Sequence, residues 1–233
     1  MSLPKIDLPV YECELPSTGK KIQYVPFTVK EEKILLTAQE SDDPKQVMIA
    51  IKQILNNCLQ NTDVTELAIF DIEFLLIQLR SKSVDNEVEF KIKDPETEEE
   101  IELQLDLATV KVIKSDEHTN VIKLSDKYSL FLKYPSIDQF EKLMSKEDQN
   151  SEDSYDIMIS CIDKLASKDE VYNFKDLSKT EINDFVESLH SDTIKMIKKF
   201  FDTMPKVRHE IIYRNSKGNE QTFVIEGTQS FFI

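Results

Sequence analysis

The stretch Leu15–Lys33, which reads L-P-S-T-G-K-K-I-Q-Y-V-P-F-T-V-K-E-E-K, predicts a β-hairpin that leads directly into a helix. Gly19 follows P-S-T, where a turn is favoured, and the prolines on either side confine both short strands to edge or end positions. Thr28 and Glu31 form the capping box T-V-K-E, so a helix is expected to begin near Val29. The stretch therefore starts a fold that mixes helices and strands.

Two more helices are expected after the first. Asp43 before Pro44 supplies a cap and a first-turn proline, and apolar residues then recur every three or four positions as far as Leu59. The next helix, from about Asp63 to Leu79, is apolar nearly all round. It is predicted to be the most buried helix of the first half.

Beyond residue 84 the pattern changes to a period of two residues, which predicts a long antiparallel hairpin around the turn D-P-E-T-E-E. The alternation gives each strand one apolar face. These faces carry Val88, Phe90 and Ile92 on the first strand, and Ile101, Leu103 and Leu105 on the second. Further short strands are expected at 110–113, 121–124 and 128–132.

The second half predicts more helices and a final hairpin. The helices are expected from 136 onward and at 155–166, 179–189 and 192–202, and the hairpin turns at N-S-K-G. The polar run 146–154 is interpreted as a linker or loop. The expected fold is therefore α+β, with helices packed against several antiparallel β-hairpins, and is divided into 1–145, the linker 146–154, and 155–233.

The composition limits the classes of partner. A chain of 233 residues can bury a core without disulfides, and its net charge of −15 argues against binding a nucleic-acid backbone or an anionic membrane. Basic partners are favoured, although the acidity can also serve solubility alone. The three cysteines are far apart, and neither a signal sequence nor a membrane-spanning run is expected, so a cytoplasmic protein is predicted.

Catalytic motifs are missing from the sequence. Three glycines are too few for a phosphate-binding loop or a dinucleotide fingerprint, and no serine lies in G-x-S-x-G. The acidic groups Asp42–Asp43 and Glu98–Glu100 can in principle act as acid and base but are more typical of solvated turns. The histidines lack zinc-binding spacing: they are His118, His190 and His209. We therefore predict no enzyme activity, no catalytic or metal-binding residue, and no cofactor.

Two segments suggest contacts with other proteins. Phe231, Phe232 and Ile233 form an apolar end that could insert into a neighbour's groove or fold back onto its own core. The acidic turn Asp94–Glu100 could recognise a basic partner or act only as a solubilising turn. Neither alternative is decided by the residues alone.

Four pieces of the sequence resemble one known family. Leu15–Leu36 is similar to the N-terminal signature of the baseplate hub proteins of T-even-type contractile-tailed bacteriophages. Three later pieces fit the same resemblance in order: V-E-F-K-I-K-D-P-E-T, the segment Ile122–Ser136, and G-T-Q-S-F-F from Gly227. Together these pieces span most of the chain.

The resemblance implies a non-enzymatic late protein used when the central hub of the baseplate is assembled in the host cytoplasm. Such a protein either acts as an assembly chaperone or stays in the hub as a structural subunit of the virion. Its implied partners are other hub proteins, including the spike complex and the tape measure protein. An enzyme of unrecognised type is the remaining alternative.

The resemblance also bears on metal binding. Similar members can carry cysteine pairs at hairpins of the type near Asp94 and Asn215, and those hairpins resemble zinc knuckles. Neither hairpin holds a cysteine in this chain. The turns are therefore expected to be held by the side chains of D-P-E-T and N-S-K-G instead.

The stretch Leu15–Lys33 is also the first choice of interaction surface, and two of its sides are candidates. The apolar side carries Ile22, Tyr24 and Phe27, and the polar side carries Lys20, Lys21, Lys30 and Lys33. Which side meets the partner is left open by the sequence.

Overall fold

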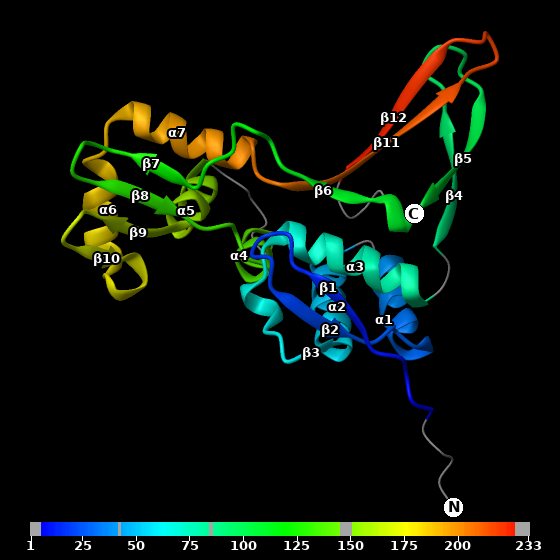
Figure 1. The fold of residues 1–233 in the computed structure, drawn as a ribbon, viewed down its shortest axis with the longest axis horizontal. Coiled ribbons are helices and arrows are strands. Elements are labelled where there is room, and N and C mark those ends of the chain that lie inside the picture. The colour runs from blue at the N-terminus through cyan, green and yellow to red at the C-terminus, as the bar shows by residue number, and fades with distance from the viewer. Residues whose placement is uncertain (1–5, 42, 84–85, 145–150, 227–233) are drawn as a thin grey trace, which may run out of the picture. The chain divides into compact units, whose positions relative to one another are not determined.

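The computed structural model describes residues 6–41, 43–83, 86–144 and 151–226. Within these residues, seven α-helices and twelve β-strands form an α+β fold with several small antiparallel sheets, as the sequence predicts (Figure 1). Contacts divide the chain into two compact units. Unit 1 contains residues 1–113 and 206–233, and unit 2 contains residues 114–205.

Unit 1 begins with the predicted hairpin. Its strands belong to a sheet of order β1-β2-β3, formed by β1 (Tyr11–Glu14), β2 (Lys21–Tyr24) and β3 (Leu59–Gln60). The turn closes through a hydrogen bond of 2.9 Å from the Leu15 N–H to the Lys20 carbonyl. Gly19 has a φ of +69°, a left-handed conformation that glycine adopts without a steric penalty.

Three helices follow in unit 1: α1 (Val29–Glu40), α2 (Pro44–Cys58) and α3 (Ile69–Ser83). The predicted cap of α2 is confirmed, because Asp43 Oδ1 accepts a hydrogen bond of 2.9 Å from the Lys45 N–H. α3 begins later than expected because Asp63 caps a separate 3-10 turn at Val64–Glu66. Most of α3 is buried, as its apolar sequence predicts.

The rest of unit 1 consists of two hairpins. β4 (Glu87–Lys93) pairs with β5 (Glu100–Asp106), and a second sheet has the order β12-β11-β6, with β12 at Glu220–Glu226, β11 at Lys206–Arg214 and β6 at Lys111–Ile113. The β4–β5 register confirms the predicted apolar face, since Val88 pairs with Leu105, Phe90 with Leu103 and Ile92 with Ile101.

The two hairpins share a core with α3. Inward residues of β4, β5, β11 and β12 pack together with Ile77 of α3, and the rings of Phe90 and Phe223 lie 5.7 Å apart between centroids. Burial of such aliphatic and aromatic side chains is the main stabilising contribution expected here. The last hairpin of the chain therefore completes a core whose other residues come from the first half.

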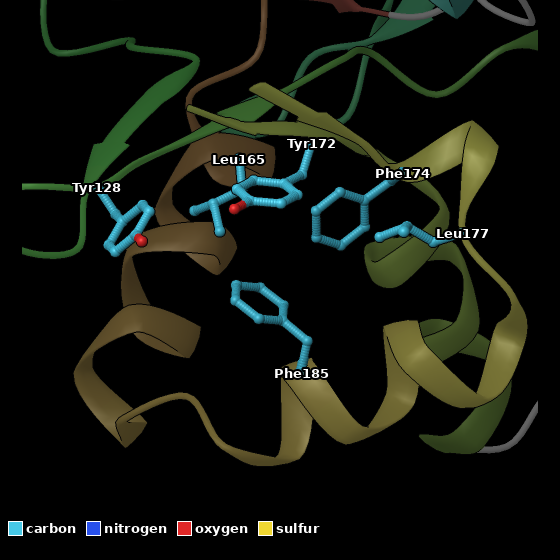
Figure 2. A pocket seen from close by; sticks show the side chains of 6 residues that line it. All are labelled: Tyr128, Leu165, Tyr172, Phe174, Leu177 and Phe185. Atoms are coloured by element: carbon cyan, nitrogen blue, oxygen red, sulfur yellow. The ribbon is translucent and has the colours of Figure 1, made fainter. Parts of the chain in front are cut away.

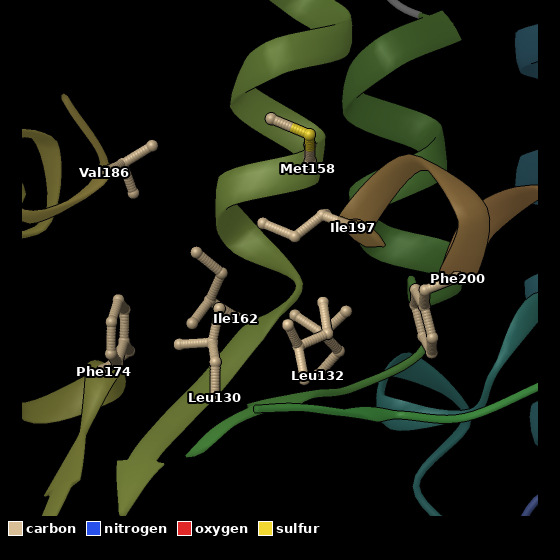
Figure 3. Close-up of a cluster of buried hydrophobic side chains, with 9 residues drawn as sticks. Leu130, Leu132, Met158, Ile162, Phe174, Val186, Ile197 and Phe200 are labelled. Atoms are coloured by element: carbon tan, nitrogen blue, oxygen red, sulfur yellow. The ribbon is translucent and has the colours of Figure 1, made fainter. Parts of the chain in front are cut away.

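Unit 2 has one sheet of order β10-β9-β8-β7. Its strands are β7 (Val121–Lys123), β8 (Ser129–Leu132), β9 (Ile162–Ala166) and β10 (Val171–Asn173). Its helices are α4 (Ile137–Met144), α5 (Ser151–Ser160), α6 (Lys179–Glu187) and α7 (Ser191–Asp202), with a 3-10 turn at Phe174–Asp176. The helices contribute Met158, Val186, Ile197 and Phe200 to a core that Leu130, Leu132 and Ile162 of the sheet complete (Figure 3).

The helix predicted at 155–166 is wrong in its second half. α5 ends at Ser160, and Ile162–Ala166 is the strand β9, which pairs with β8 on one side and β10 on the other. Sheet pairing overrides the local helical pattern because β9 lies between two strands and satisfies its backbone groups there.

The two units also differ from the predicted division at 146–154. The strands β8 and β9 lie on opposite sides of that run and pair with each other, so both belong to unit 2. Part of the run, Ser151 onward, belongs to α5, and residues 145–150 lie outside the described residues. Within the described ranges, no helix combines the length and the apolar character needed to cross a bilayer.

Candidate functional site

The stretch Leu15–Lys33 is bonded to the helices of unit 1 along its length. The Ser17 N–H donates to Asp71 Oδ1 of α3 at 3.0 Å, and the Ser17 hydroxyl donates to Asp71 Oδ2. Further along, the Val25 N–H donates to the carbonyl of Cys58 at 2.9 Å, and the Phe27 N–H donates to Ser83 Oγ at 2.9 Å. The stretch is therefore an integral part of unit 1.

The carboxylate of Asp71 has an unusual environment. Asp71 is fully buried, and burial raises its pKa, an effect that the hydrogen bonds from Ser17 only partly offset. The capping residue Glu31 is also buried, but hydrogen bonds from Thr28 and Asn57 outweigh the effect of burial and lower its pKa. The expected capping contact is present, since the Thr28 N–H donates to Glu31 Oε2 at 3.0 Å. Asp71 joins the hairpin turn at Ser17 to α3, and Glu31 joins the start of α1 to Asn57 of α2.

The predicted interaction residues of this stretch differ in exposure. Ile22 and Tyr24 are 3% and 1% exposed and pack inside unit 1, whereas Phe27 is half-buried. Lys30 is exposed, with 70% of its side chain accessible. Whether these residues bind a partner stays a prediction, but Ile22 and Tyr24 do not form a free surface. The accessible side is the polar one, which carries Lys20, Lys21, Lys30 and Lys33.

The predicted apolar end cannot be placed in the same way. Phe231, Phe232 and Ile233 lie outside the described residues, so whether they meet a partner or their own core stays a prediction.

The tips of the two hairpins of unit 1 are joined by a polar network. Asp94 is 1% exposed, and its Oδ1 accepts from the Glu96 and Thr97 N–H groups at 3.0 and 2.7 Å, which closes the first turn. The Tyr213 hydroxyl of β11 donates to Asp94 Oδ2 at 2.8 Å. Burial opposes ionisation of Asp94, but these hydrogen bonds prevail and lower its pKa to about 2.

Glu96 continues the network toward the second turn. Its carboxylate accepts from the Asn215 side chain at 2.8 Å and from the Asn219 side chain at 2.9 and 3.0 Å, and Lys217 Nζ lies 3.5 Å away. These hydrogen bonds, with the charge of Lys217, lower the pKa of Glu96. Side chains of D-P-E-T and N-S-K-G thus hold the two turns, as the sequence predicts for tips without cysteines. Among the described residues, no three histidine, cysteine or acidic side chains gather as metal ligands would.

The structure does not bring the three histidines together. His118 is buried in unit 2, where its ring nitrogens contact Thr203 and Tyr134. His190 caps α7 and accepts from the Asp192 N–H at 3.3 Å, while His209 lies in β11 of unit 1. Of the acidic groups singled out in the sequence, Asp43 caps α2 and Glu98 lies in a tight turn with a φ of +61°. Asp42 lies outside the described residues.

Unit 2 contains an aromatic pocket that the sequence did not predict. It is an open pocket of about 230 Å³, and six side chains line it: Tyr128, Leu165, Tyr172, Phe174, Leu177 and Phe185 (Figure 2). The rings of Phe174 and Phe185 meet edge to face, 5.5 Å apart between centroids. These residues come from four separate segments, and one of them lies in the strand that was predicted as a helix. No local pattern could have grouped them.

Both tyrosines at this pocket already contact charged side chains of the chain. The Tyr172 hydroxyl donates to Glu170 Oε2 at 2.5 Å, which raises the pKa of Tyr172, and Lys127 Nζ lies 5.0 Å from the centre of the Tyr128 ring. Apart from the two phenols, the lining offers no group that can transfer a proton. The arrangement suits an apolar or aromatic side chain better than a reaction.

One comparison with known proteins identifies the chain. The family model described as T4 bacteriophage base plate protein matches residues 8–233, which is nearly the whole sequence. The chain belongs to this family. As a member of the T4 base plate protein family, it is a bacteriophage baseplate protein with a structural or assembly role in the phage tail. No curated protein and no solved structure matched.

Proposed function

We propose that this protein is a non-enzymatic assembly factor or chaperone of the baseplate hub. It acts through contacts with other hub proteins, with the spike complex and the tape measure protein as the first candidates, in the host cytoplasm during tail assembly. The observation that carries the proposal is the family match over residues 8–233. The resemblance of Leu15–Leu36 to the hub proteins supports the finer assignment to the hub.

The buried carboxyl and thiol groups of the chain make structural contacts, which supports a role without catalysis. Asp71 and Asp94 have shifted pKa values because they are bonded inside the fold, and neither lines the aromatic pocket. Burial raises the pKa of Cys13 and Cys161 to about 11 and that of Cys58 to about 12, which keeps the thiols protonated and unreactive. In a protein that acts through its surfaces, we expect side chains with shifted pKa values to make structural contacts rather than to form a catalytic site.

The contact surface proposed in unit 1 is the polar side of Leu15–Lys33. Lys30 and Lys33 are one turn apart on α1 and both are exposed, as are Lys20 and Lys21 at the start of β2. On a chain of net charge −15, this group of exposed lysines suits an acidic surface of a partner. The apolar end Phe231–Ile233 is retained as a second proposed contact.

Co-expression with individual hub proteins followed by affinity co-purification tests this proposal. The variant Lys30→Glu with Lys33→Glu should stay folded and lose most of the co-purified partner, because like charges then face each other. The matched control is Lys45→Glu with Lys111→Glu, which reverses two exposed lysines elsewhere in unit 1. Equal recovery of the partner by both variants would exclude this surface, and failure of every hub protein to co-purify with the unchanged chain would refute the hub role.

A permanent structural subunit of the hub is the second candidate. The description of the matching family, which names a base plate protein, favours it. A chaperone leaves the particle after assembly, whereas a subunit stays. Denaturing gel analysis of purified virions separates the two, since the 27.1 kDa chain is present only if it is a subunit.

A further inference from the structure

The sheet of unit 2 has an open edge at β10. Among the described strands, β10 is bordered by β9 alone. The Ser167 N–H donates to the Glu170 carbonyl at 2.8 Å, so these two residues form a hydrogen-bonded pair at the start of the β9–β10 hairpin. Because hydrogen-bonded pairs alternate along an antiparallel ladder, Val171 and Ala166 form the next pair without hydrogen bonds. The N–H and carbonyl of Val171 therefore point away from β9, toward the open edge.

The side chains of β10 leave this edge accessible. None of its three residues is a proline or carries a charge, which are two features that keep edge strands from pairing. Val171 is 58% exposed and Tyr172 is 41% exposed. The Asn173 N–H also points outward, whereas the Asn173 carbonyl, at the N-cap of the 3-10 turn, accepts the first hydrogen bond of that turn. An added strand can therefore bond the Val171 N–H and carbonyl and the Asn173 N–H.

The aromatic pocket lies beside this edge, on one face of the sheet. Tyr172 and its partner on β9, Leu165, both line the pocket (Figure 2). A residue opposite Tyr172 on an added strand directs its side chain to the same face, because residues paired across a ladder share a face. A cavity of about 150 Å³ is enough to hold benzene, so an open pocket of about 230 Å³ has room for a phenyl ring. The edge and the pocket can thus bind one and the same segment.

The charges around the edge indicate the kind of segment. The stretch 169–187 contains β10, α6 and most residues that line the pocket. Its charged residues are all exposed and mostly acidic: Asp169, Glu170, Asp176, Glu181, Asp184 and Glu187, against Lys175 and Lys179. Glu170 precedes β10 and accepts from the Tyr172 hydroxyl, and Asp176 accepts from the Asn173 side chain at 3.4 Å. Lys127, over the Tyr128 ring, lies in the β7–β8 turn instead. Both ends of β10 therefore favour positive charge on a partner.

We propose that β10 and the aromatic pocket form a docking site for an extended, basic segment of another protein. The segment adds to the edge of β10 as a strand, inserts an aromatic side chain into the pocket opposite Tyr172, and places lysine or arginine near Glu170 and Asp176. Because β10 is short, backbone bonds supply limited affinity, and the inserted side chain provides most of the specificity. The site is separate from the lysines proposed as a contact in unit 1 and does not require a hub partner.

A synthetic peptide, acetyl-K-T-V-F-V-T-K-amide, tests the site on the full chain. Its central phenylalanine lies between residues of high strand propensity, and its lysines supply the positive charge. In two-dimensional NMR of the isotope-labelled chain, the amide signals of Val171–Asn173 and Phe185 should shift and saturate as peptide is added. Replacing the phenylalanine by alanine should weaken binding about tenfold or more. Replacing both lysines by glutamate should weaken it at least about fivefold at low salt.

Two pairs of variants assign the binding to the edge and to the pocket. Val171→Pro removes the outward N–H and keeps the pair of Leu165 with Tyr172, so it should weaken the peptide about fivefold, whereas Val171→Ala keeps the N–H and should bind normally. Tyr172→Ala removes one wall of the pocket and should weaken the peptide about tenfold. Its matched control is Tyr155→Ala, at a tyrosine of α5 that is 37% exposed, which should bind as the unchanged chain does.

Several results would overturn the proposal. These are the absence of shifts at millimolar peptide, equal binding of the three peptides, and equal binding by the two tyrosine variants, which decides even if Val171→Pro fails to fold. The peptide G-T-Q-S-F-F-I, which copies residues 227–233, tests the chain's own end as the occupant. It lacks positive charge, and tighter binding than that of the lysine peptide would assign the site to that end. A dimer of the unchanged chain that Val171→Pro abolishes in analytical ultracentrifugation would assign the edge to a second copy.

Discussion

The hydrogen bonds from Ser17 to Asp71 make Ser17→Ala the most informative single substitution in unit 1. The hydroxyl donates to Oδ2 of a carboxylate that is fully buried in α3, while the backbone N–H keeps its bond of 3.0 Å to Oδ1. Alanine removes the first bond alone and leaves one oxygen of a buried carboxylate without this donor. The hairpin turn should then hold less firmly to α3.

The magnitude follows from the cost of leaving a buried acceptor unsatisfied, which is about 1–3 kcal/mol. For an unfolding slope of about 2 kcal/mol per molar urea, a loss of about 2 kcal/mol lowers the midpoint by about 1 M. Because burial raises the pKa of Asp71, its ionisation in the folded state costs stability as pH rises through that pKa. The Ser17 hydroxyl favours the ionised form, so the variant should lose more stability near neutral pH than in acid.

Equilibrium urea unfolding followed by far-UV circular dichroism measures this loss. The control is Ser216→Ala, which removes an exposed hydroxyl in the same unit and should change the midpoint little. A midpoint for Ser17→Ala equal to that of the control would refute the role of the bond. A loss of the same size near neutral pH and at about pH 4 would refute the pH argument alone.

Three more predictions concern the hairpin tips of unit 1 and the core of unit 2. Glu96→Ala should separate the hairpin tips and speed hydrogen exchange at 215–219, whereas the exposed Glu100→Ala should not. The hydrogen bonds lower the pKa of Asp94 to about 2, below its pKa in the unfolded chain. Its contribution to stability is therefore present above the unfolded pKa and is lost as pH falls through about 2. Acid unfolding of the unchanged chain and of the Asp94→Asn variant measures this loss. Leu130→Ala should lower the free energy of unfolding by about 2–5 kcal/mol, measured in urea, against little change for Val171→Ala at a residue that is 58% exposed.

The features that the sequence predicted are those with local causes. Alternation over Val88–Ile92 predicted the apolar face of β4. Asp43 and Thr28 marked helix starts because their side chains accept hydrogen bonds from N–H groups two residues away. The pairing of strands that are far apart in the sequence leaves no comparable local pattern. Neither β9 as a strand nor the pairing of β6 with β11 could be derived from neighbours in the sequence.

The candidate interaction surfaces could be predicted only in part from the sequence, for the same reason. Alternation over Ile22 and Tyr24 predicts an apolar face, but a face covered by the chain's own helices and one covered by a partner have the same pattern. The exposure of Ile22 and Tyr24, 3% and 1%, shows that unit 1 itself covers this face. The lysines could be named from the sequence, because exposed charges are the usual complement of a buried strand face.

The return of β11 and β12 to unit 1 has a consequence for synthesis on the ribosome. Residues 114–205, which form unit 2, emerge before the partner strands that unit 1 requires, so unit 2 can become compact while unit 1 still lacks Val207 and Ile225 of its core. Closing this long loop delays β6–β11 pairing, because contacts distant in sequence form last. Until then the apolar faces of β4 and β5 stay uncovered and are the part of the nascent chain most exposed to aggregation.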